Sequence, residues 1–197
     1  MREKTANSRE AIVETATELF GKQGYHGTGL NQIVKESQCP KGSLYYYFPE
    51  GKVELALESI RRTKNKVSER WERFFAASDN PAQTIRRIIE ETAMEAEHTD
   101  FKCFLPFSFW TAVEASYVND KLREAWLDVF TSWQGVLSRE LKRFGIRDEL
   151  AGEAAMTVMS LLEGAVHLTV TSRDTRPLLN ASKHMDLYLD HLVNHTP

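Results

Sequence analysis

The chain has 197 residues, and its hydrophobic and charged fractions of 42% and 27% are typical of a soluble globular protein long enough to bury a core. It shows no uninterrupted apolar run of membrane-spanning length, and its sparse glycine and proline argue against a low-complexity chain. The two cysteines, Cys39 and Cys103, lie far apart, which argues against a disulfide framework and predicts a reducing compartment.

The net charge of −3 does not by itself indicate a nucleic-acid-binding protein, but the charge is unevenly distributed. Residues 1–66 hold eleven Lys and Arg against eight Asp and Glu, a balance of +3, and the remaining residues hold fourteen against twenty, a balance of −6. A basic amino-terminal part on an acidic body is compatible with DNA binding by one end.

The first predicted element is a helix that starts near Ser8. Its apolar residues recur on one helical face: Ile12, Ala16, Leu19 and Phe20. Asn7 or Ser8 is suited to cap the start of this helix, and Gly24 is suited to end it.

Two short helices are predicted next, over residues 28–35 and 40–46. Thr28 is expected to cap the first, and Pro40 suits the first turn of the second. A turn of three or four residues joins them, which is the layout of a helix-turn-helix.

The stretch LYYYF in the second short helix places four aromatic residues side by side, and one helical face cannot hold them all. Leu44 and Phe48, four residues apart, are expected to face the core together. Tyr45 and Tyr47 then project towards the place of DNA phosphates, where a phenol is a rigid ligand. Tyr46 is expected to pack partly against the same small domain.

The residues before these aromatics are small or basic. Lys41, Gly42 and Ser43 open the second short helix, where small side chains let the backbone approach base edges in the major groove. These three residues meet that requirement of a recognition helix.

A long helix is predicted over residues 52–75. Asn80-Pro81 marks a restart, because asparagine is a good cap and proline favours the first helical position. The stretch from Asp100 to Pro106 is expected to interrupt the helices.

Three further helices complete the prediction. One opens at Asn119 and closes at Gly145, one covers residues 147–172, and the last runs from 177 to about 194. Because no strand pairs or repeats are evident, the predicted fold class is all-α with about nine helices.

Aromatic residues also crowd the segment FKCFLPFSFWTAVEAS, and drug-sized ligands bind in pockets lined by aromatics with a few polar groups. The residues predicted to hold a mostly apolar or aromatic ligand are Phe104, Phe107, Trp110, Glu114, Trp126, Phe130, Trp133, Met159, Glu163 and His167. The alternative is that these aromatics are plain core, the commoner outcome for each residue taken singly.

The last two predicted helices have a composition suited to close helix packing. The first carries Ala154, Ala155, Gly164 and Ala165 among larger apolar residues, and the second is rich in leucine. Two such helices from each of two subunits are suited to a four-helix interface, which predicts a homodimer. The same pattern is compatible with an ordinary core.

No motif of a nucleotide-binding loop, zinc protease or nucleophile elbow occurs, so we predict no catalytic residues, no enzyme activity and no cofactor. His191 and His195 lie four residues apart and offer the alternative of a metal site with His184 or His98. Their place at a fraying terminus argues against it, so we predict no metal site.

The segment TGLNQIVKESQCPKGSLYYYFPEGKVEL resembles the DNA-binding signature of TetR-type transcriptional regulators. It carries the signature residues Thr28, Ile33, Lys41, Gly42, Leu44, Tyr45, Tyr47, Phe48, Lys52 and Leu55. Gln38 stands where the family's turn usually has glycine, which puts a non-glycine residue near the left-handed conformation. Cys39-Pro40 and the additional Gly51 resemble the branch of the lincomycin-resistance repressor.

This resemblance covers about residues 8–60. It implies a helix-turn-helix domain over 1–51 and a helical ligand-binding and dimerisation domain over 52–197, linked through the long helix. The residues that it implies at double-stranded operator DNA are Lys41, Gly42 and Ser43 for bases, and Thr28, Tyr45, Tyr47 and Lys52 for phosphates.

The resemblance also implies a cytoplasmic homodimer, commonly a repressor, that binds a palindromic operator and leaves it when a small effector binds. No membrane association is expected. The alternative is a helical small-molecule or metal-binding protein whose DNA-binding head is vestigial.

Overall fold

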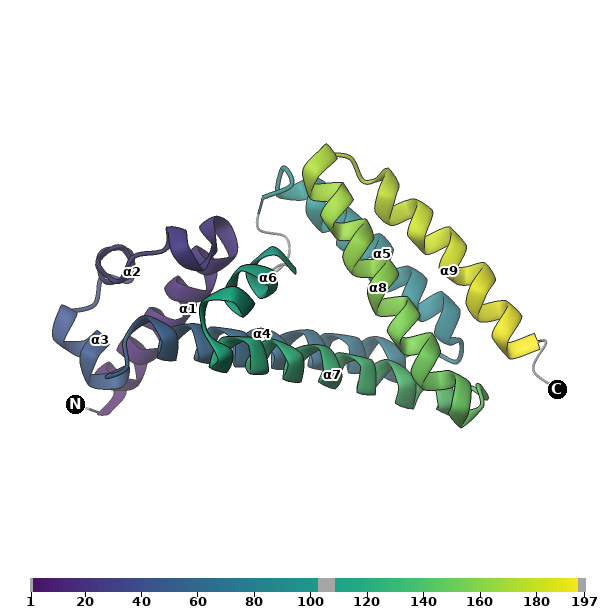
Figure 1. Ribbon diagram of the computed structural model, residues 1–197, viewed down its shortest axis with the longest axis horizontal. Helices are drawn as coiled ribbons and strands as arrows, with labels where there is room; N and C mark the ends of the chain where they lie inside the picture. Colours follow the sequence, from purple (N-terminus) through teal and green to yellow (C-terminus); the bar gives the residue numbers. More distant parts are fainter. Residues whose placement is uncertain (1, 103–108, 195–197) are drawn as a thin grey trace. The chain divides into compact units, whose positions relative to one another are not determined.

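The computed structural model of the chain describes residues 2–102 and 109–194 (Figure 1). These residues form helices joined by short turns, with no strand among them, so the predicted all-α class is confirmed. The helices are α1 (Arg2–Gly27), α2 (Leu30–Glu36), α3 (Lys41–Tyr47), α4 (Lys52–Ala76), α5 (Pro81–His98), α6 (Phe109–Val118), α7 (Asp120–Arg143), α8 (Asp148–Ser172) and α9 (Arg176–Asn194).

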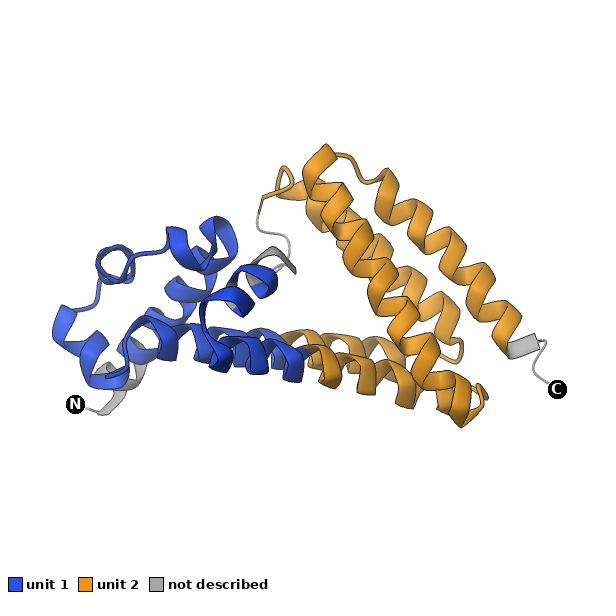
Figure 2. Cartoon of the chain, in the orientation of Figure 1, with its two compact units in different colours: residues 1–65, 105–129 blue, residues 66–104, 130–197 orange. Residues whose placement is uncertain are grey.

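The chain divides into two compact units (Figure 2). Unit 1 comprises residues 1–65 and 105–129, and unit 2 comprises residues 66–104 and 130–197. The long helices α4 and α7 therefore contribute residues to both units. The division at residue 51 follows sequence motifs instead of contacts, and it stays a prediction.

In unit 1, helix α1 packs against α2, α3 and α6. The side chains that fill this core are at most 4% exposed: Ile12, Val13, Ala16, Leu19, Phe20, Ile33, Leu44, Phe48, Leu55, Ala56 and Ile60. Burying one large apolar side chain of this kind stabilises the fold by roughly 1.5–3 kcal/mol. Ion pairs of Arg9 with Glu58 and of Arg62 with Glu10 also join α1 to α4.

Helix α1 is longer than predicted at both ends. It begins at Arg2, so the expected cap at Asn7 or Ser8 is wrong, because the residues before them continue the helix. At Gly24 the backbone turns to φ 77° and ψ 173°, which kinks the helix, and one more turn follows to Gly27. Gly24 thus interrupts α1 as predicted but does not end it.

In unit 2, helices α5 and α8 both pack against α9. Its buried core includes Phe75, Ile85, Ile89, Leu137, Leu141, Ala154, Ala155, Val158, Leu178, Met185 and Leu189. Between α4 and α7, the rings of Trp71 and Trp133 lie with their centroids 5.8 Å apart. The pairing of apolar faces at helical spacing is therefore what builds this unit.

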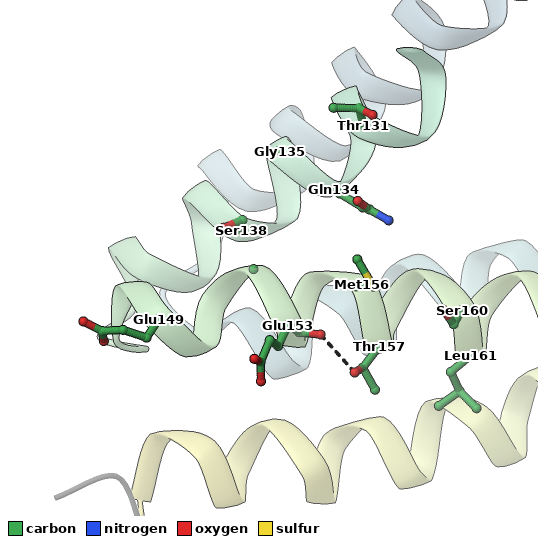
Figure 3. Close-up of a pocket in the computed structure, with 11 residues that line it drawn as sticks. Thr131, Gln134, Gly135, Ser138, Glu149, Glu153, Met156, Thr157, Ser160 and Leu161 are labelled. Carbon is green, nitrogen blue, oxygen red and sulfur yellow. Dashed lines mark hydrogen bonds between the residues drawn. The ribbon is translucent and has the colours of Figure 1, made fainter. Parts of the chain in front are cut away.

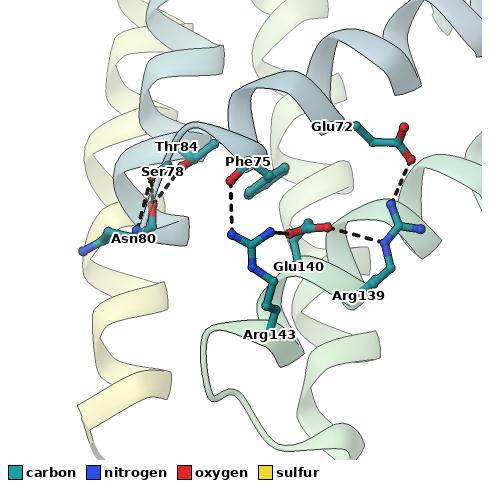
Figure 4. Close-up of polar contacts among 8 residues, drawn as sticks. All are labelled: Glu72, Phe75, Ser78, Asn80, Thr84, Arg139, Glu140 and Arg143. Atoms are coloured by element: carbon teal, nitrogen blue, oxygen red, sulfur yellow. Dashed lines mark hydrogen bonds and ion pairs between the residues drawn. The ribbon is translucent and has the colours of Figure 1, made fainter.

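A polar network reinforces the α4–α7 contact in unit 2 (Figure 4). Glu140 is only 7% exposed, and its carboxylate accepts hydrogen bonds from Arg143 at 3.1 Å and from Arg139 at 3.4 Å. Arg139 also bonds Glu72 at 2.9 Å, and Arg143 reaches the carbonyl oxygen of Phe75 at 3.4 Å. Two guanidinium partners compensate the desolvation of the buried carboxylate.

Three helix boundaries follow from caps that the sequence predicts. The side chain of Asn80 accepts a hydrogen bond from Gln83 N at 3.0 Å, with Pro81 at the first position of α5. Asn119 caps α7 by accepting from Lys121 N at 2.8 Å, and Gly145 adopts φ 97° after it. These boundaries are confirmed.

Among the described residues, helix α8 is long and apolar enough to cross a membrane by length and composition alone. The buried core helix of a soluble protein passes the same test, so this is weak evidence for a span. Only 39% of its most apolar window is buried within the chain, which leaves an exposed side for other contacts.

Candidate DNA-binding surface and effector site

Helices α2 and α3 are joined by a tight turn over residues 37–40. Ser37 N donates to Ile33 O at 2.9 Å, and Gln38 N donates to Lys35 O at 3.4 Å. Gln38 then adopts φ 56°, which confirms the expected left-handed position held by a non-glycine residue. The chain can therefore reverse direction within four residues, as a helix-turn-helix requires.

The inner side of α3 is fixed by two buried residues. Leu44 is 0% exposed and Phe48 is 1% exposed, so the prediction that both face the core is confirmed. The guanidinium carbon of Arg9 lies 5.3 Å from the centroid of the Phe48 ring. These contacts hold the short helix at a fixed rotation, which decides the residues it presents outward.

The outer side of α3 starts with exposed Lys41 and Gly42, while Ser43 is half-buried. A Cβ atom added to Gly42 would meet nothing within 4 Å, so the space outside this residue is open. Tyr45 is 46% exposed, and Lys41 Nζ lies 5.9 Å from the centroid of its ring. The exposed side of α3 in unit 1, called the head here together with α1 and α2, thus carries basic, small and aromatic residues.

Tyr46 lies elsewhere than expected. It is 78% exposed, so the prediction that it packs against the small domain is wrong. Its ring stands edge-on to that of half-buried Tyr47, with the centroids 5.0 Å apart. Helical geometry explains this, because Tyr46 is two residues from both Leu44 and Phe48 and so points opposite to them. The spacing alone would have identified Tyr46 as an outward residue.

Thr28 has a different local role from the predicted one. The N-cap of α2 is Gly29, with no side-chain cap, so the expectation that Thr28 caps this helix is wrong. Thr28 is 0% exposed, and its hydroxyl donates to Gly24 O at 2.8 Å. A phosphate contact by this side chain would require the turn to open, and it stays a prediction.

Lys52 opens α4 and is half-buried. Its Nζ lies 4.4 Å from the centroid of the Tyr25 ring, an arrangement that attracts a cation. Burial lowers the pKa of Lys52, and the nearby carboxylate of Glu114 opposes that change. The predicted phosphate contact of Lys52 is untested.

Three of the residues predicted to hold an effector fall where no side chain is described. Phe104 and Phe107 lie outside the described residues, as does the side chain of Trp110. Glu114 is described, and both of its carboxylate oxygens already accept hydrogen bonds from backbone amides of α1.

The predicted aromatic residues of α7 divide between the two units. Trp126, in unit 1, is 2% exposed. Trp133, in unit 2, is 6% exposed, and its ring contacts half-buried Phe130 edge-on with the centroids 6.0 Å apart. Trp133 also packs on Trp71, which is the arrangement of a core residue.

The α8 residues predicted to hold an effector differ in their exposure to solvent. Met159 is 3% exposed, whereas His167 lies on the exposed side of the helix. Glu163 is half-buried, and desolvation raises its pKa to about 7. No hydrogen bond or ion pair reaches Glu163 within the part of the chain that the structure describes.

An open groove of about 1050 Å³ lies in unit 2 between α7 and α8 (Figure 3). Its walls are formed by Thr131, Gln134, Gly135 and Ser138 of α7 and by residues from Glu149 to Leu161 of α8. None of the seven described residues predicted to hold an effector lines this groove. The groove is therefore separate from the described part of the predicted effector site. The α8 residues that line it are on the outer side of that helix.

The metal alternative finds no support in the described residues, where no three His, Cys, Asp or Glu side chains gather at one place. His195, one of the histidines on which it depends, lies outside them.

The all-α fold and the turn between α2 and α3 define a helix-turn-helix protein of the transcription-regulator class. Residues 12–58 match the model of bacterial regulatory proteins of the tetR family, and residues 81–184 match that of the C-terminal domain of LmrA/YxaF-like transcriptional regulators. The chain belongs to the TetR family of helix-turn-helix transcriptional regulators, which also indicates that it is not an enzyme.

Three similar proteins support this assignment. The chain is 40% identical to YxaF, an uncharacterized HTH-type transcriptional regulator of Bacillus subtilis (strain 168), over 88% of this chain and 90% of that protein. It is 38% identical to the HTH-type transcriptional regulator LmrA of the same organism, over 89% and 93% of the two chains. A solved TetR transcriptional regulator from Chloroflexus aurantiacus J-10-FL superposes with a TM-score of 0.82, at 30% identity and 98% coverage of both chains.

Proposed function

We propose that the protein is a cytoplasmic, ligand-responsive repressor, which binds a palindromic operator as a homodimer and leaves it when a small, mostly apolar effector binds. The observation that carries the DNA-binding part is the arrangement of α3. Leu44 and Phe48 anchor its inner side, while Lys41, Gly42 and Tyr45 stay exposed on its outer side. This arrangement supports base contacts by Lys41, Gly42 and Ser43 and phosphate contacts by Tyr45 and Tyr47.

The exposed side of α8 supports dimerisation. It presents large apolar residues to solvent, among them Met156 at 56% exposure and Leu168 at 58%. Ser160 and Gly164 lie on the same stripe, and a Cβ added to Gly164 would meet nothing within 4 Å, so a partner helix can approach closely there. On α9, Leu179 and Leu187 are exposed as well. We therefore place the two-fold interface on α8 and α9.

A dimer also satisfies a requirement of the operator. One helix-turn-helix reads only a few base pairs, so regulators of this class place two recognition helices about 34–36 Å apart on successive major grooves. A palindromic operator matches the two-fold symmetry of such a pair.

The effector is assigned to unit 2 on the basis of its apolar interior and one carboxyl group. Met159 and Trp133 are buried, and Glu163 is a half-buried acid with a pKa near 7. A mostly apolar site with one polar group is the usual composition of a small-molecule pocket. The predicted effector contacts of Phe107, Trp110, Glu114 and Trp126, which fall in unit 1, stay untested.

Release requires that the effector bind the DNA-incompetent state more tightly than the DNA-competent state. Helix α4 begins beside the head at Lys52 and continues into unit 2, so it is a direct route for such a change. Because DNA fixes the half-site spacing, a shift of a few ångströms between recognition helices is enough to release it.

The experiment that tests the DNA-binding part compares Tyr45→Ala with Tyr117→Ala. Tyr117 is 89% exposed on α6, so its removal is a matched control for the loss of an exposed tyrosine in unit 1. Binding is measured at two salt concentrations to a duplex from the region upstream of the protein's own gene. We expect Tyr45→Ala to weaken binding about tenfold, because it removes a phosphate ligand, and Tyr117→Ala to bind like the wild type.

Equal binding by both variants would show that Tyr45 does not contact DNA. If the folded wild-type protein binds no upstream or selected duplex in preference to scrambled DNA, the head is vestigial and the proposed function fails. The effector part is tested separately by a thermal-shift screen of aromatic and lipophilic compounds, in which no stabilising compound would contradict it.

A further inference from the structure

Glu114 of α6 binds the main chain of α1 at the kink of that helix. Tyr25 N donates to Glu114 Oε2 at 3.0 Å, and His26 N donates to Oε1 at 2.7 Å. The kink at Gly24 interrupts the helical ladder, so the first amides after it need other acceptors. A carboxylate that accepts two backbone hydrogen bonds is a strong and directional partner, because both bonds are charge-assisted.

A side chain at Gly24 would displace the carboxylate of Glu114 from its place at the kink. A Cβ added at Gly24 would lie 2.6 Å from Glu114 Oε2, closer than any normal contact. The φ of 77° at Gly24 is also one that other residues seldom adopt. The kink and the carboxylate are therefore shaped for each other, which a chance surface contact would not require.

Three further hydrogen bonds form between this turn and the start of helix α2. The carbonyl oxygen of Gly24 accepts the hydroxyl of buried Thr28 at 2.8 Å, directly before the start of α2. From the preceding residue, Gln23 Nε2 donates to Gly27 O at 2.9 Å and to Gln32 Oε1 of α2 at 2.7 Å. A movement of α6 is thus transmitted to α2 through fixed contacts, all of them inside unit 1.

Lys52 lies on the other side of the same turn. Its ammonium group lies over the ring of Tyr25. The backbone amide of the same residue donates the hydrogen bond to Glu114. The charge of Glu114 also favours the charged form of Lys52.

We propose that Glu114 is a positioning residue for DNA recognition, which clamps the α1–α2 turn to α6 and thereby sets where α2 and α3 stand for the operator. The proposal rests on the DNA-binding function proposed above. Glu114 itself does not contact DNA, so its effect is on the geometry of the reading head. It differs from the prediction that Glu114 recognises an effector, because both of its oxygens are already used within the head.

The test compares three variants with the wild-type protein on two DNA duplexes. Glu114→Ala removes both acceptors, and Glu114→Gln keeps one acceptor oxygen. Glu124→Gln removes the same charge from an exposed site of unit 1 and controls for the electrostatic effect on DNA binding. Affinities are measured for a duplex that the wild-type protein selects from a random library and for a scrambled duplex of equal length, at two salt concentrations.

We expect Glu114→Ala to weaken binding to the selected duplex about tenfold, with unchanged affinity for scrambled DNA and an unchanged salt dependence, because the phosphate contacts remain available while the register is lost. Glu114→Gln is expected to lose about threefold, since one of two hydrogen bonds survives. Glu124→Gln should leave the ratio of the two affinities as it is in the wild type.

Amide hydrogen exchange of the DNA-free proteins gives an independent readout. In Glu114→Ala the amides of Tyr25 and His26 should exchange faster, followed by those of α2, while α5, α8 and α9 keep their protection. An equal loss on both duplexes, or general loss of protection, would mean a merely structural role and would overturn the proposal. The proposal would also be overturned if the ratio of the two affinities in Glu114→Ala equalled that of the wild type. A wild-type protein that selects no duplex would instead defeat the DNA-binding function itself, and the positioning role with it.

Discussion

The two units differ in how they hold a partly buried glutamate, Glu114 in unit 1 and Glu163 in unit 2. In unit 1, the hydroxyl of Thr28 and the carboxylate of Glu114 are both hydrogen-bonded to backbone atoms of the α1–α2 turn. In unit 2, Glu140 is held between two arginines, but Glu163 is desolvated without a hydrogen bond in the described part of the chain. The contrast lies in these carboxylates: Glu114 is held in one geometry, whereas Glu163 is a group whose partner and charge can change. Buried hydroxyls without a hydrogen bond in the described part of the chain occur in both units, at Ser59 and Thr63 in unit 1 and at Thr169 in unit 2.

The first prediction tests the fixed geometry of the recognition helix in unit 1 with the substitution Gly42→Leu. Nothing lies within 4 Å of a Cβ at this position, so the substitution should leave the fold intact, and leucine is the better helix former. At the start of α3 the added side chain should hold the backbone away from base edges. We expect operator binding to fall by about 100-fold, measured by fluorescence anisotropy.

Gly42→Ala is the graded control for this experiment and should lose much less affinity. If Gly42→Leu bound the operator like the wild type at an unchanged melting temperature, α3 would not approach the bases through this residue.

The next prediction concerns unit 2, where the outer side of α8 exposes the apolar residues that we propose to contact a second copy of the chain. Leu168→Glu places a charge at the proposed interface, and two-fold symmetry places two such charges in each dimer. We expect the dimer dissociation constant to rise by at least about 100-fold, because each charge must be buried without a partner. Sedimentation equilibrium measures this directly.

Met94→Glu is the matched control, because Met94 is 60% exposed on α5 against 58% for Leu168 on α8. Its dimer constant should stay at the wild-type value. Dissociation by both variants, or by neither, would place the interface elsewhere than on α8.

The smallest expected effect concerns Glu163 and depends on pH. Its pKa is raised to about 7 in the folded chain, above the ordinary value of an unfolded glutamate, so the folded state binds the proton more tightly. Stability therefore has its full contribution below the unfolded pKa and loses it as the pH rises through 7. Glu163→Gln removes this loss and should stabilise the protein by about 1–2 kcal/mol at pH 8, with little change at pH 4.5.

Urea unfolding at both pH values and a fixed protein concentration measures this difference. Glu153→Gln, on the exposed side of the same helix, should behave like the wild type at both. A Glu163→Gln variant whose stability follows the same pH curve as the wild type would show that Glu163 is solvated or paired in solution.

Local chemistry explains what the sequence predicted correctly. Asn80, Asn119 and Gly145 set helix boundaries through caps and a left-handed turn, and each depends only on its near neighbours. The helix-turn-helix was predictable for the same reason, since its turn and its buried pair Leu44 and Phe48 are encoded within a dozen residues.

The misplacement of Tyr46 was a local error, since helical spacing alone points it outward, whereas other features depend on distant residues. Thr28 has the composition of a cap, yet its hydroxyl is used by a kink that depends on a residue far along the chain. The contact of Glu114 with α1 could not be predicted, because only the fold brings the two together, and the predicted effector role of Glu114 stays a prediction. The groove between α7 and α8 was missed because its lining alternates polar and small residues, which carries no signal of its own.

The close fit of Gly24 and Glu114 also constrains how this chain can change over evolutionary time. A Cβ at residue 24 would lie 2.6 Å from Glu114 Oε2, so the end of the Glu114 side chain would have to move away and give up its bonds to the turn. The backbone of residue 24, with φ 77° and ψ 173°, also lies in a region that is essentially restricted to glycine. Among descendants of this protein, residue 24 should therefore stay glycine even where residue 114 has changed.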